Sequence, residues 1–200
     1  MLRVRVLCYT AIRNEERRET VFLFGHLGIT LGIAVLLFRI LKIEPNRQLY
    51  GAVLVGAILP DLIDKPIGEI ILSQSLSNGR LFAHTLLFVL ILLVIGLYDY
   101  KRNGELWGVM LCGAAFIHLC EDQMWRTPET LLYPAFGFAF PQGIVELHWW
   151  DYFIAAFFRT YSLSPEAAYA FYSDLLGIAI LLLFALQWLR TQRWSERAIS

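Results

Sequence analysis

Long apolar runs limit the fold of this chain more than any other feature of its sequence. The first run, "VFLFGHLGITLGIAVLLFRI" at residues 21–40, contains no Asp, Glu, Lys or Arg before Arg39. A helix that crosses a bilayer needs about 20 mostly apolar residues, so this run has the required length. The whole chain is 58% hydrophobic and only 17% charged, whereas soluble domains carry roughly 25% charged residues. We therefore predict an all-α, polytopic membrane protein.

Further apolar runs divide the chain into about five expected transmembrane helices. The second run is short for a full span, and the third is the most continuous. The expected spans cover residues 21–40, 49–63, 81–98, 106–125 and 167–189. They form one transmembrane helical domain at residues 21–190, between a charged N-terminal extension (1–20) and a C-terminal tail (191–200). We expect the protein to reside in the cell membrane, with membrane lipid as its surroundings and partner.

Charge and cysteine content exclude several other classes of protein. The formal net charge is zero, so no bulk electrostatic attraction to nucleic acid is expected. The three cysteines, Cys8, Cys112 and Cys120, show neither metal-type nor disulfide spacing, and we interpret them as small buried hydrophobic residues. No pattern in the chain indicates its oligomeric state.

Histidines and acids occur at matching ends of successive spans. Because consecutive spans cross the membrane in opposite directions, the start of the first helix and the end of the second lie on the same face. The third helix starts on that face, and the fourth ends there. The candidate residues at these ends are His26, Asp61, Asp64, His84, His118 and Asp122. The sequence therefore predicts a metal site at one membrane face.

Two short motifs carry most of the expected metal chemistry. In "HLCED", His118 and Asp122 are four residues apart and share a helix face, so an imidazole and a carboxylate could bind one divalent ion. Asp61 and Asp64 share a face if the helix continues past Pro60, although this proline favours a kink or a helix end. The alternatives are a polar helix end and a solvated helix-to-loop junction. Acids within spans are costly, however, and are usually functional.

Other polar residues near these motifs have several open roles. Arg80, just before the third span, could hold an anionic substrate group beside a helix N-terminus, or act as an interfacial anchor. Asp64 could be a ligand, an orienting group or a catalytic general base. Glu146, His148 and Asp151 in "ELHWWD" are weaker site candidates, because the adjacent tryptophans equally indicate an interfacial anchor.

The candidates support one main hypothesis and two alternatives. The main one is a hydrolase in which a divalent metal, most plausibly zinc, activates water. Its expected ligands are His26, Asp61, His84, His118 and Asp122. A non-enzymatic membrane protein could instead use the cluster as a structural metal site or a polar packing network. A transporter is the third option, but its site would be expected near the bilayer midplane.

The motifs together resemble the YdjM-like group of membrane-bound metal-dependent hydrolases. The resemblance covers about residues 22–141 and rests on His26, "LPDLID", "GRLFAHT", "HLCED" and the later "YPAFGFAFP". "LPDLID" has one more residue between its acids than the usual element, and Gly79 stands where the family often has histidine. Arg80 and His84 keep their spacing. The charged N-terminal extension is a further departure.

This group is thought to be distantly related to the zinc-dependent phospholipase C and single-strand nuclease superfamily. Enzymes of that superfamily hold several zinc ions with His and Asp clusters on helices. The resemblance therefore implies one or more zinc ions and hydrolysis, with a lipid phosphoester as a possible substrate.

Overall fold

The computed structural model describes residues 23–72, 75–76, 78–142, 154, 158 and 168–197. Within these residues the protein is helical and contains no strand, which confirms the predicted all-α class. The charged N-terminal extension lies outside the described residues, and so do Glu146, His148 and Asp151.

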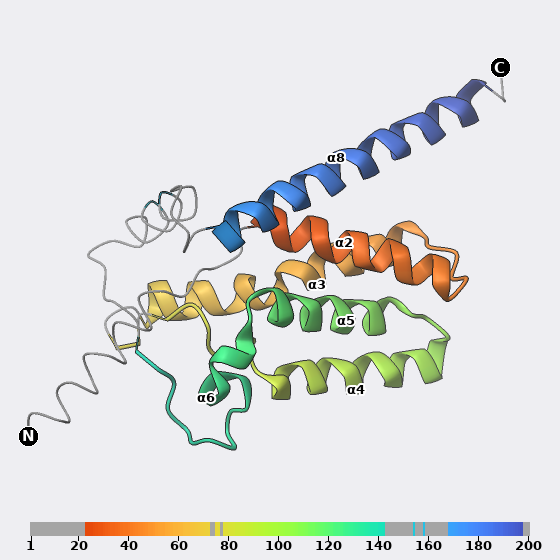
Figure 1. The fold of residues 1–200 in the computed structure, drawn as a ribbon. Coiled ribbons are helices and arrows are strands. Elements are labelled where there is room, and N and C mark those ends of the chain that lie inside the picture. Colours follow the sequence, from red (N-terminus) through yellow and green to blue (C-terminus); the bar gives the residue numbers. More distant parts are fainter. Residues whose placement is uncertain are drawn as a thin grey trace, which may run out of the picture.

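Five long helices build the described part of the chain (Figure 1). Helices α2 to α5 lie side by side, and α8 packs on α2 and continues beyond the bundle. Within the bundle, α5 contacts both α3 and α4. The long helices are α2 (Leu23–Ile40), α3 (Arg47–Lys65), α4 (Leu86–Asn103), α5 (Trp107–Glu121) and α8 (Ala168–Arg197). Short elements are the π-helix η1 (Pro66–Ile71), the 3-10 helix η2 (Met124–Arg126) and α6 (Pro128–Leu131).

Each predicted span overlaps one of the long helices, but several boundaries differ. Helix α4 begins at Leu86 rather than at Leu81, because Thr85 has an extended backbone and its hydroxyl accepts a hydrogen bond from the N–H of Phe88 at 3.1 Å. Helix α5 ends at Glu121 rather than at residue 125, because Gln123 adopts a left-handed conformation with φ 52°. Helix α8 continues past residue 190 into the predicted tail.

Two helices in the described residues are long and apolar enough to cross a membrane, Leu23–Ile40 and Ala168–Arg190. Trp107–Glu121 is a shorter apolar helix. Helices α3 and α4 carry charges in their last turns, namely Asp64 and Lys65 in α3 and Lys101 and Arg102 in α4. The number of five spans therefore stays a prediction.

Close helix contacts are made at glycines, where a side chain would collide with a neighbouring backbone. A Cβ atom on Gly28 of α2 would lie 2.1 Å from the carbonyl oxygen of Gly177 in α8. A Cβ atom on Gly56 of α3 would lie 2.4 Å from the carbonyl oxygen of Leu111 in α5. Small residues allow such close approach between membrane helices. The contact at Gly56 fixes α5 against α3, the two helices that carry His118 and Asp61.

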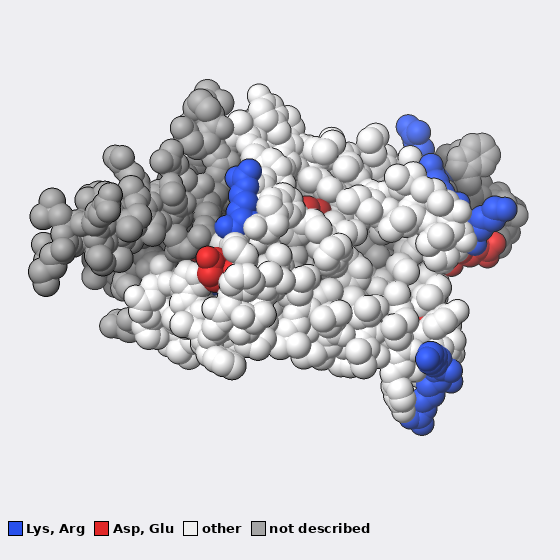
Figure 2. All heavy atoms as spheres, turned by 60° about the horizontal axis from the view of Figure 1, so that its bottom comes forward, with Lys and Arg blue, Asp and Glu red and all other residues white. Residues whose placement is uncertain are grey.

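The outer faces of the helices are apolar. Leu90 and Val94 of α4 and Leu183 of α8 are 55%, 67% and 60% exposed. Figure 2 shows a broad, largely uncharged surface, in which most of the coloured charged residues lie toward the two ends of the described part. Soluble monomers rarely expose contiguous apolar surfaces of this extent, whereas a lipid-facing surface is expected to be uncharged.

Candidate metal centre

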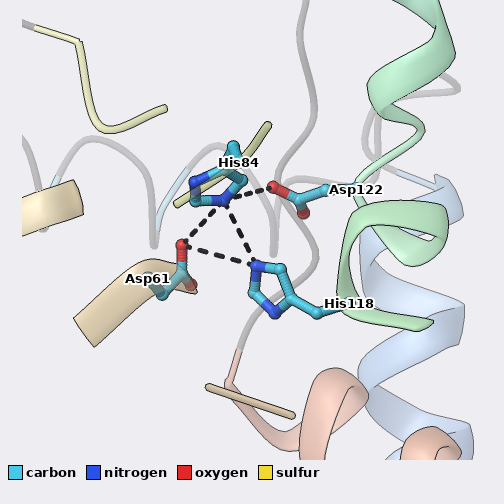
Figure 3. A group of neighbouring side chains, drawn as sticks. All are labelled: Asp61, His84, His118 and Asp122. Carbon is cyan, nitrogen blue, oxygen red and sulfur yellow. Dashed lines mark hydrogen bonds and ion pairs between the residues drawn. The ribbon is translucent and has the colours of Figure 1, made fainter. Parts of the chain in front are cut away.

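Four side chains from different segments meet at one end of the bundle (Figure 3). Each of them offers one nitrogen or oxygen atom, and these atoms all lie within 4.8 Å of one another. Asp61 comes from α3, His84 from the turn before α4, His118 from α5, and Asp122 from the position that ends α5. The structure thus brings together four of the five predicted ligands.

The donor atoms are spaced closely enough for one small ion. His84 Nε2 lies 3.3 Å from His118 Nε2, 3.6 Å from Asp61 Oδ1 and 3.7 Å from Asp122 Oδ2. His118 Nε2 lies 3.8 Å from Asp61 Oδ1. In a tetrahedral zinc site with bonds of about 2.0–2.2 Å, the donors would be about 3.3–3.6 Å apart. These four separations are close to this spacing, but the whole donor set extends to 4.8 Å, so the wider pairs would have to close by up to about 1 Å around a single ion.

Asp64 lies beside His84, outside this four-residue group. Its fully buried carboxylate accepts hydrogen bonds from the backbone N–H groups of Leu81 (2.7 Å), Ala83 (3.0 Å) and His84 (3.1 Å). It also lies 2.8 Å from Nδ1 of His84. Asp64 therefore shapes the turn before α4 and orients the ring of His84, in the way that outer carboxylates orient metal-binding histidines.

In their neutral forms, the two histidines of the group present unprotonated nitrogens to each other. Nδ1 of His118 lies 2.7 Å from the backbone carbonyl of Ala57, which can only accept, so this nitrogen carries the proton. Nδ1 of His84 donates in the same way to the carboxylate of Asp64. In the neutral rings both Nε2 atoms then hold lone pairs, and two lone pairs 3.3 Å apart cannot form a hydrogen bond. A cation between them fits this arrangement.

His26 lies next to the group rather than within it. Its ring stacks on that of His118, with centroids 4.0 Å apart. Its Nε2 is 3.4 Å from Oδ1 of Asp122. Both atoms are buried, and neither has a hydrogen-bond partner among the described residues. His26 therefore contacts two of the candidate ligands from one side.

Glu121 is part of the site although its role does not follow from the sequence motifs. Its Oε2 lies 2.6 Å from Nδ1 of His26, and its Oε1 accepts from the hydroxyl of Thr30 at 3.1 Å. The hydroxyl of Tyr169 in α8 donates to its backbone carbonyl at 2.9 Å. Glu121 thus links α5 to α2 and α8. The sequence feature that could have indicated this role is the position of Glu121 three residues after His118, on the same face of the helix.

Two cations lie on the outer side of the carboxylates. Arg80 Nε and Nη2 lie 2.9 and 2.8 Å from Oδ2 of Asp122, and Nζ of Lys65 lies 2.6 Å from Oδ2 of Asp61. The Arg80 side chain is 12% exposed and that of Lys65 26%. The predicted anion-binding arginine therefore stands beside a candidate ligand, at the partly accessible edge of the centre.

The group has the chemistry of a divalent-metal site. Two imidazole nitrogens and two carboxylate oxygens suit zinc and related first-row ions. His84 and His118 are fully buried, while the Asp61 side chain, at 18% exposed, is the most accessible of the four. Asp61, beside the partly exposed Lys65, is therefore the candidate ligand nearest to the accessible surface.

Comparisons with known proteins agree with the membrane character of the fold. No curated protein and no solved structure matches the chain. The family described as YdjM inner membrane protein matches residues 22–194, which include every residue of the centre. Together with its apolar helices, this match identifies the protein as an integral protein of the cell membrane. The chain belongs to the YdjM inner membrane protein family.

Proposed function

We propose that this protein is a membrane-bound, metal-dependent hydrolase whose ligands are Asp61, His84, His118 and Asp122. The observation that carries the proposal is the pair of buried Nε2 lone pairs, 3.3 Å apart, on His84 and His118. Two carboxylates complete the donor set within 4.8 Å. Zinc is the ion that this mixture of nitrogen and oxygen donors favours most.

The residues around the centre have distinct roles in this proposal. A bound zinc ion would lower the pKa of a coordinated water to about 7 and polarise the attacked group. Asp64 keeps the proton on Nδ1 of His84, so that Nε2 stays available. Arg80 is placed to bind an anionic oxygen of the substrate without leaving the vicinity of Asp122. A phosphoester provides such oxygens. The substrate would approach from the side of Asp61, the most exposed of the four ligands.

A structural metal site is the second candidate, because three of the four donors are almost completely buried. Structural zinc sites use four protein ligands, whereas catalytic sites keep one position for water. The partial exposure of Asp61 favours the catalytic alternative, since this ligand has room to move. The two candidates differ in their expected activity but not in their expected metal content.

The membrane arrangement is proposed along with the function. Helices α3, α4 and α5 would join α2 and α8 as spans, because α5 packs against both α3 and α4 in one bundle whose drawn face is largely uncharged. Membrane lipid would surround all five helices. The metal centre would then lie at one face, near the ends of the spans.

Metal analysis of the purified protein tests the proposal. We expect about one zinc ion or more per chain, and loss of that metal in His118→Ala and Asp122→Asn. Asp99→Asn is the matched control, because Asp99 lies in the last turns of α4, beyond the apolar stretch that follows His84. The loaded protein is then assayed with a phosphodiester and with phospholipids. A protein without stoichiometric metal, whose activity survives both substitutions, would refute the proposal. Stoichiometric metal without any hydrolysis would favour the structural site.

A further inference from the structure

A charge-free loop projects from the site end of the bundle. We call residues 132–142 the aromatic loop; in Figure 1 it follows α6 and extends away from the helices near the start of α4. No Asp, Glu, Lys or Arg occurs from residue 130 to residue 145. At the tip of the loop, Phe136 is 64% exposed and Phe138 83%. Nearby Trp125, in η2, is 59% exposed.

The conformation of this loop is fixed by its own side chains. The ring of Tyr133 stacks on that of Phe140 with centroids 4.7 Å apart. At the tip, Gly137 has φ +127° and its N–H donates to the carbonyl of Pro134 at 3.0 Å. Glycine adopts this backbone conformation readily. The loop therefore holds Phe136 and Phe138 on the outside instead of folding them inward.

The aromatic loop is also connected to the turn that carries His84. The ring of Phe82 lies 4.9 Å from that of Phe140 and 6.1 Å from that of Tyr133. The side-chain amide of Asn78 donates to the carbonyl of Pro141 at 2.7 Å. Phe82 and Asn78 lie on either side of Arg80 in the sequence. The loop is thus anchored to the segment of chain that carries Arg80 and His84.

An exposed aromatic tip of this kind is unfavourable in water but favourable at the surface of a bilayer. Tryptophan and tyrosine collect at the headgroup level of membrane proteins, and phenylalanine occurs on the membrane-facing side of interfacial segments. Each phenylalanine gains from the removal of its apolar surface from water. The helix ends around the centre lie at the same level as this loop, because α4 begins and α5 ends there.

We propose that the aromatic loop inserts Phe136 and Phe138 into the headgroup layer of the bilayer, and that the substrate is a phospholipid resident in that layer. Such a lipid would present its phosphate to Arg80 while its acyl chains stay in the membrane. The assignment of the substrate rests on the proposed hydrolase function. The assignment of the loop to the bilayer does not.

The position of the loop is measured without any activity. A nitroxide label is attached to Phe138→Cys in a background with Cys8, Cys112 and Cys120 replaced by alanine, and the protein is reconstituted in phosphatidylcholine and phosphatidylglycerol vesicles. Labels at Leu183→Cys and Asn103→Cys give the lipid and water references, since Leu183 is 60% exposed on apolar α8 and Asn103 ends α4 beside two basic residues. We expect the ratio of oxygen to nickel-chelate accessibility at position 138 to lie between the ratios at Asn103 and Leu183, as a position in the headgroup layer requires. A ratio equal to that at Asn103 would overturn the proposal.

The substrate class is tested with two substrates. In Phe136→Ser/Phe138→Ser, we expect hydrolysis of vesicle phospholipid to fall about tenfold or more, while hydrolysis of a soluble nitrophenyl phosphodiester stays within about twofold of the parent protein. Equal losses on both substrates, or no loss on either, would overturn the lipid assignment. If the parent protein hydrolyses neither substrate, the proposed function fails, and the label at position 138 still decides where the loop lies.

Discussion

The role of Asp64 can be tested by Asp64→Asn, which keeps the size of the side chain and removes its charge. The carboxylate now accepts from three backbone N–H groups and lies 2.8 Å from Nδ1 of His84. An asparagine amide offers only one acceptor oxygen and places an NH₂ group where the other carboxylate oxygen stood. At least one buried N–H would then face another donor.

The expected effect has two parts. Leaving one or two buried donors without an acceptor costs about 1–3 kcal/mol each, so we expect a loss of about 1–6 kcal/mol in the free energy of unfolding. If the NH₂ takes the position of Oδ2, it faces the N–H groups of Leu81 and His84 and can donate to Nδ1 of His84. In that orientation the ring proton moves to Nε2, which removes the lone pair that faces His118. Loss of such an outer partner typically weakens metal binding about 10–100-fold.

Both parts are measurable in detergent-purified protein. Zinc affinity is determined by competition with a chromogenic chelator, and stability from thermal unfolding of the metal-free and metal-loaded forms. Asp99→Asn serves as the matched control, because it removes a carboxylate from α4 in the same chemical way. The reasoning is refuted if Asp64→Asn binds zinc as tightly as the parent protein while keeping its unfolding temperature.

Three other substitutions test the packing, the neighbour of the centre and a helix start. Gly56→Ala should lower the free energy of unfolding by about 1–3 kcal/mol, because its Cβ would meet a backbone oxygen at 2.4 Å. Gly113→Ala is the control, because a Cβ at that position has open space around it. Equal unfolding temperatures for the two variants would contradict the packing argument. His26→Gln should keep the metal stoichiometry, since His26 stands outside the four-residue group; complete metal loss by elemental analysis would make it a ligand. Thr85→Val removes the cap of α4 and should cost about 1 kcal/mol, whereas Thr85→Ser should restore most of the stability in the same unfolding assay.

The meeting of the site residues was predictable because it depends on topology. His26 near the start of one helix, Asp61 near the end of the next and His118 near the end of a later one must approach each other if neighbouring helices run in opposite directions. Helical periodicity and apolar length determine that arrangement, and both are visible in the sequence. The structure places Asp61, His84, His118 and Asp122 together on this basis.

Which acids face the histidines and which bind the surrounding backbone was not predictable, because these roles depend on tertiary contacts. Asp61 and Asp64 are three residues apart on the same helix, yet one faces the imidazoles while the other is surrounded by the turn at residues 81–84. That turn replaces the first turn of the predicted third helix, and its free N–H groups exist only because Thr85 starts α4 later. Glu121 was missed for a similar reason, since its partners Thr30 and Tyr169 are far away in sequence.

The packing of the other end of the bundle bears on the choice between hydrolysis and transport. A pathway across the membrane would need polar groups, or water, along much of its length. Beyond the centre, however, the contact region of α2, α3 and α5 is filled by buried apolar side chains, namely Ala34, Phe38, Leu49, Val53 and Ala114. The described polar side chains of the site lie near helix ends on one side of this cluster. In the proposed hydrolase, a centre backed by this apolar cluster would exchange substrate and product with a single membrane face, whereas alternating access requires a site that opens to both faces in turn.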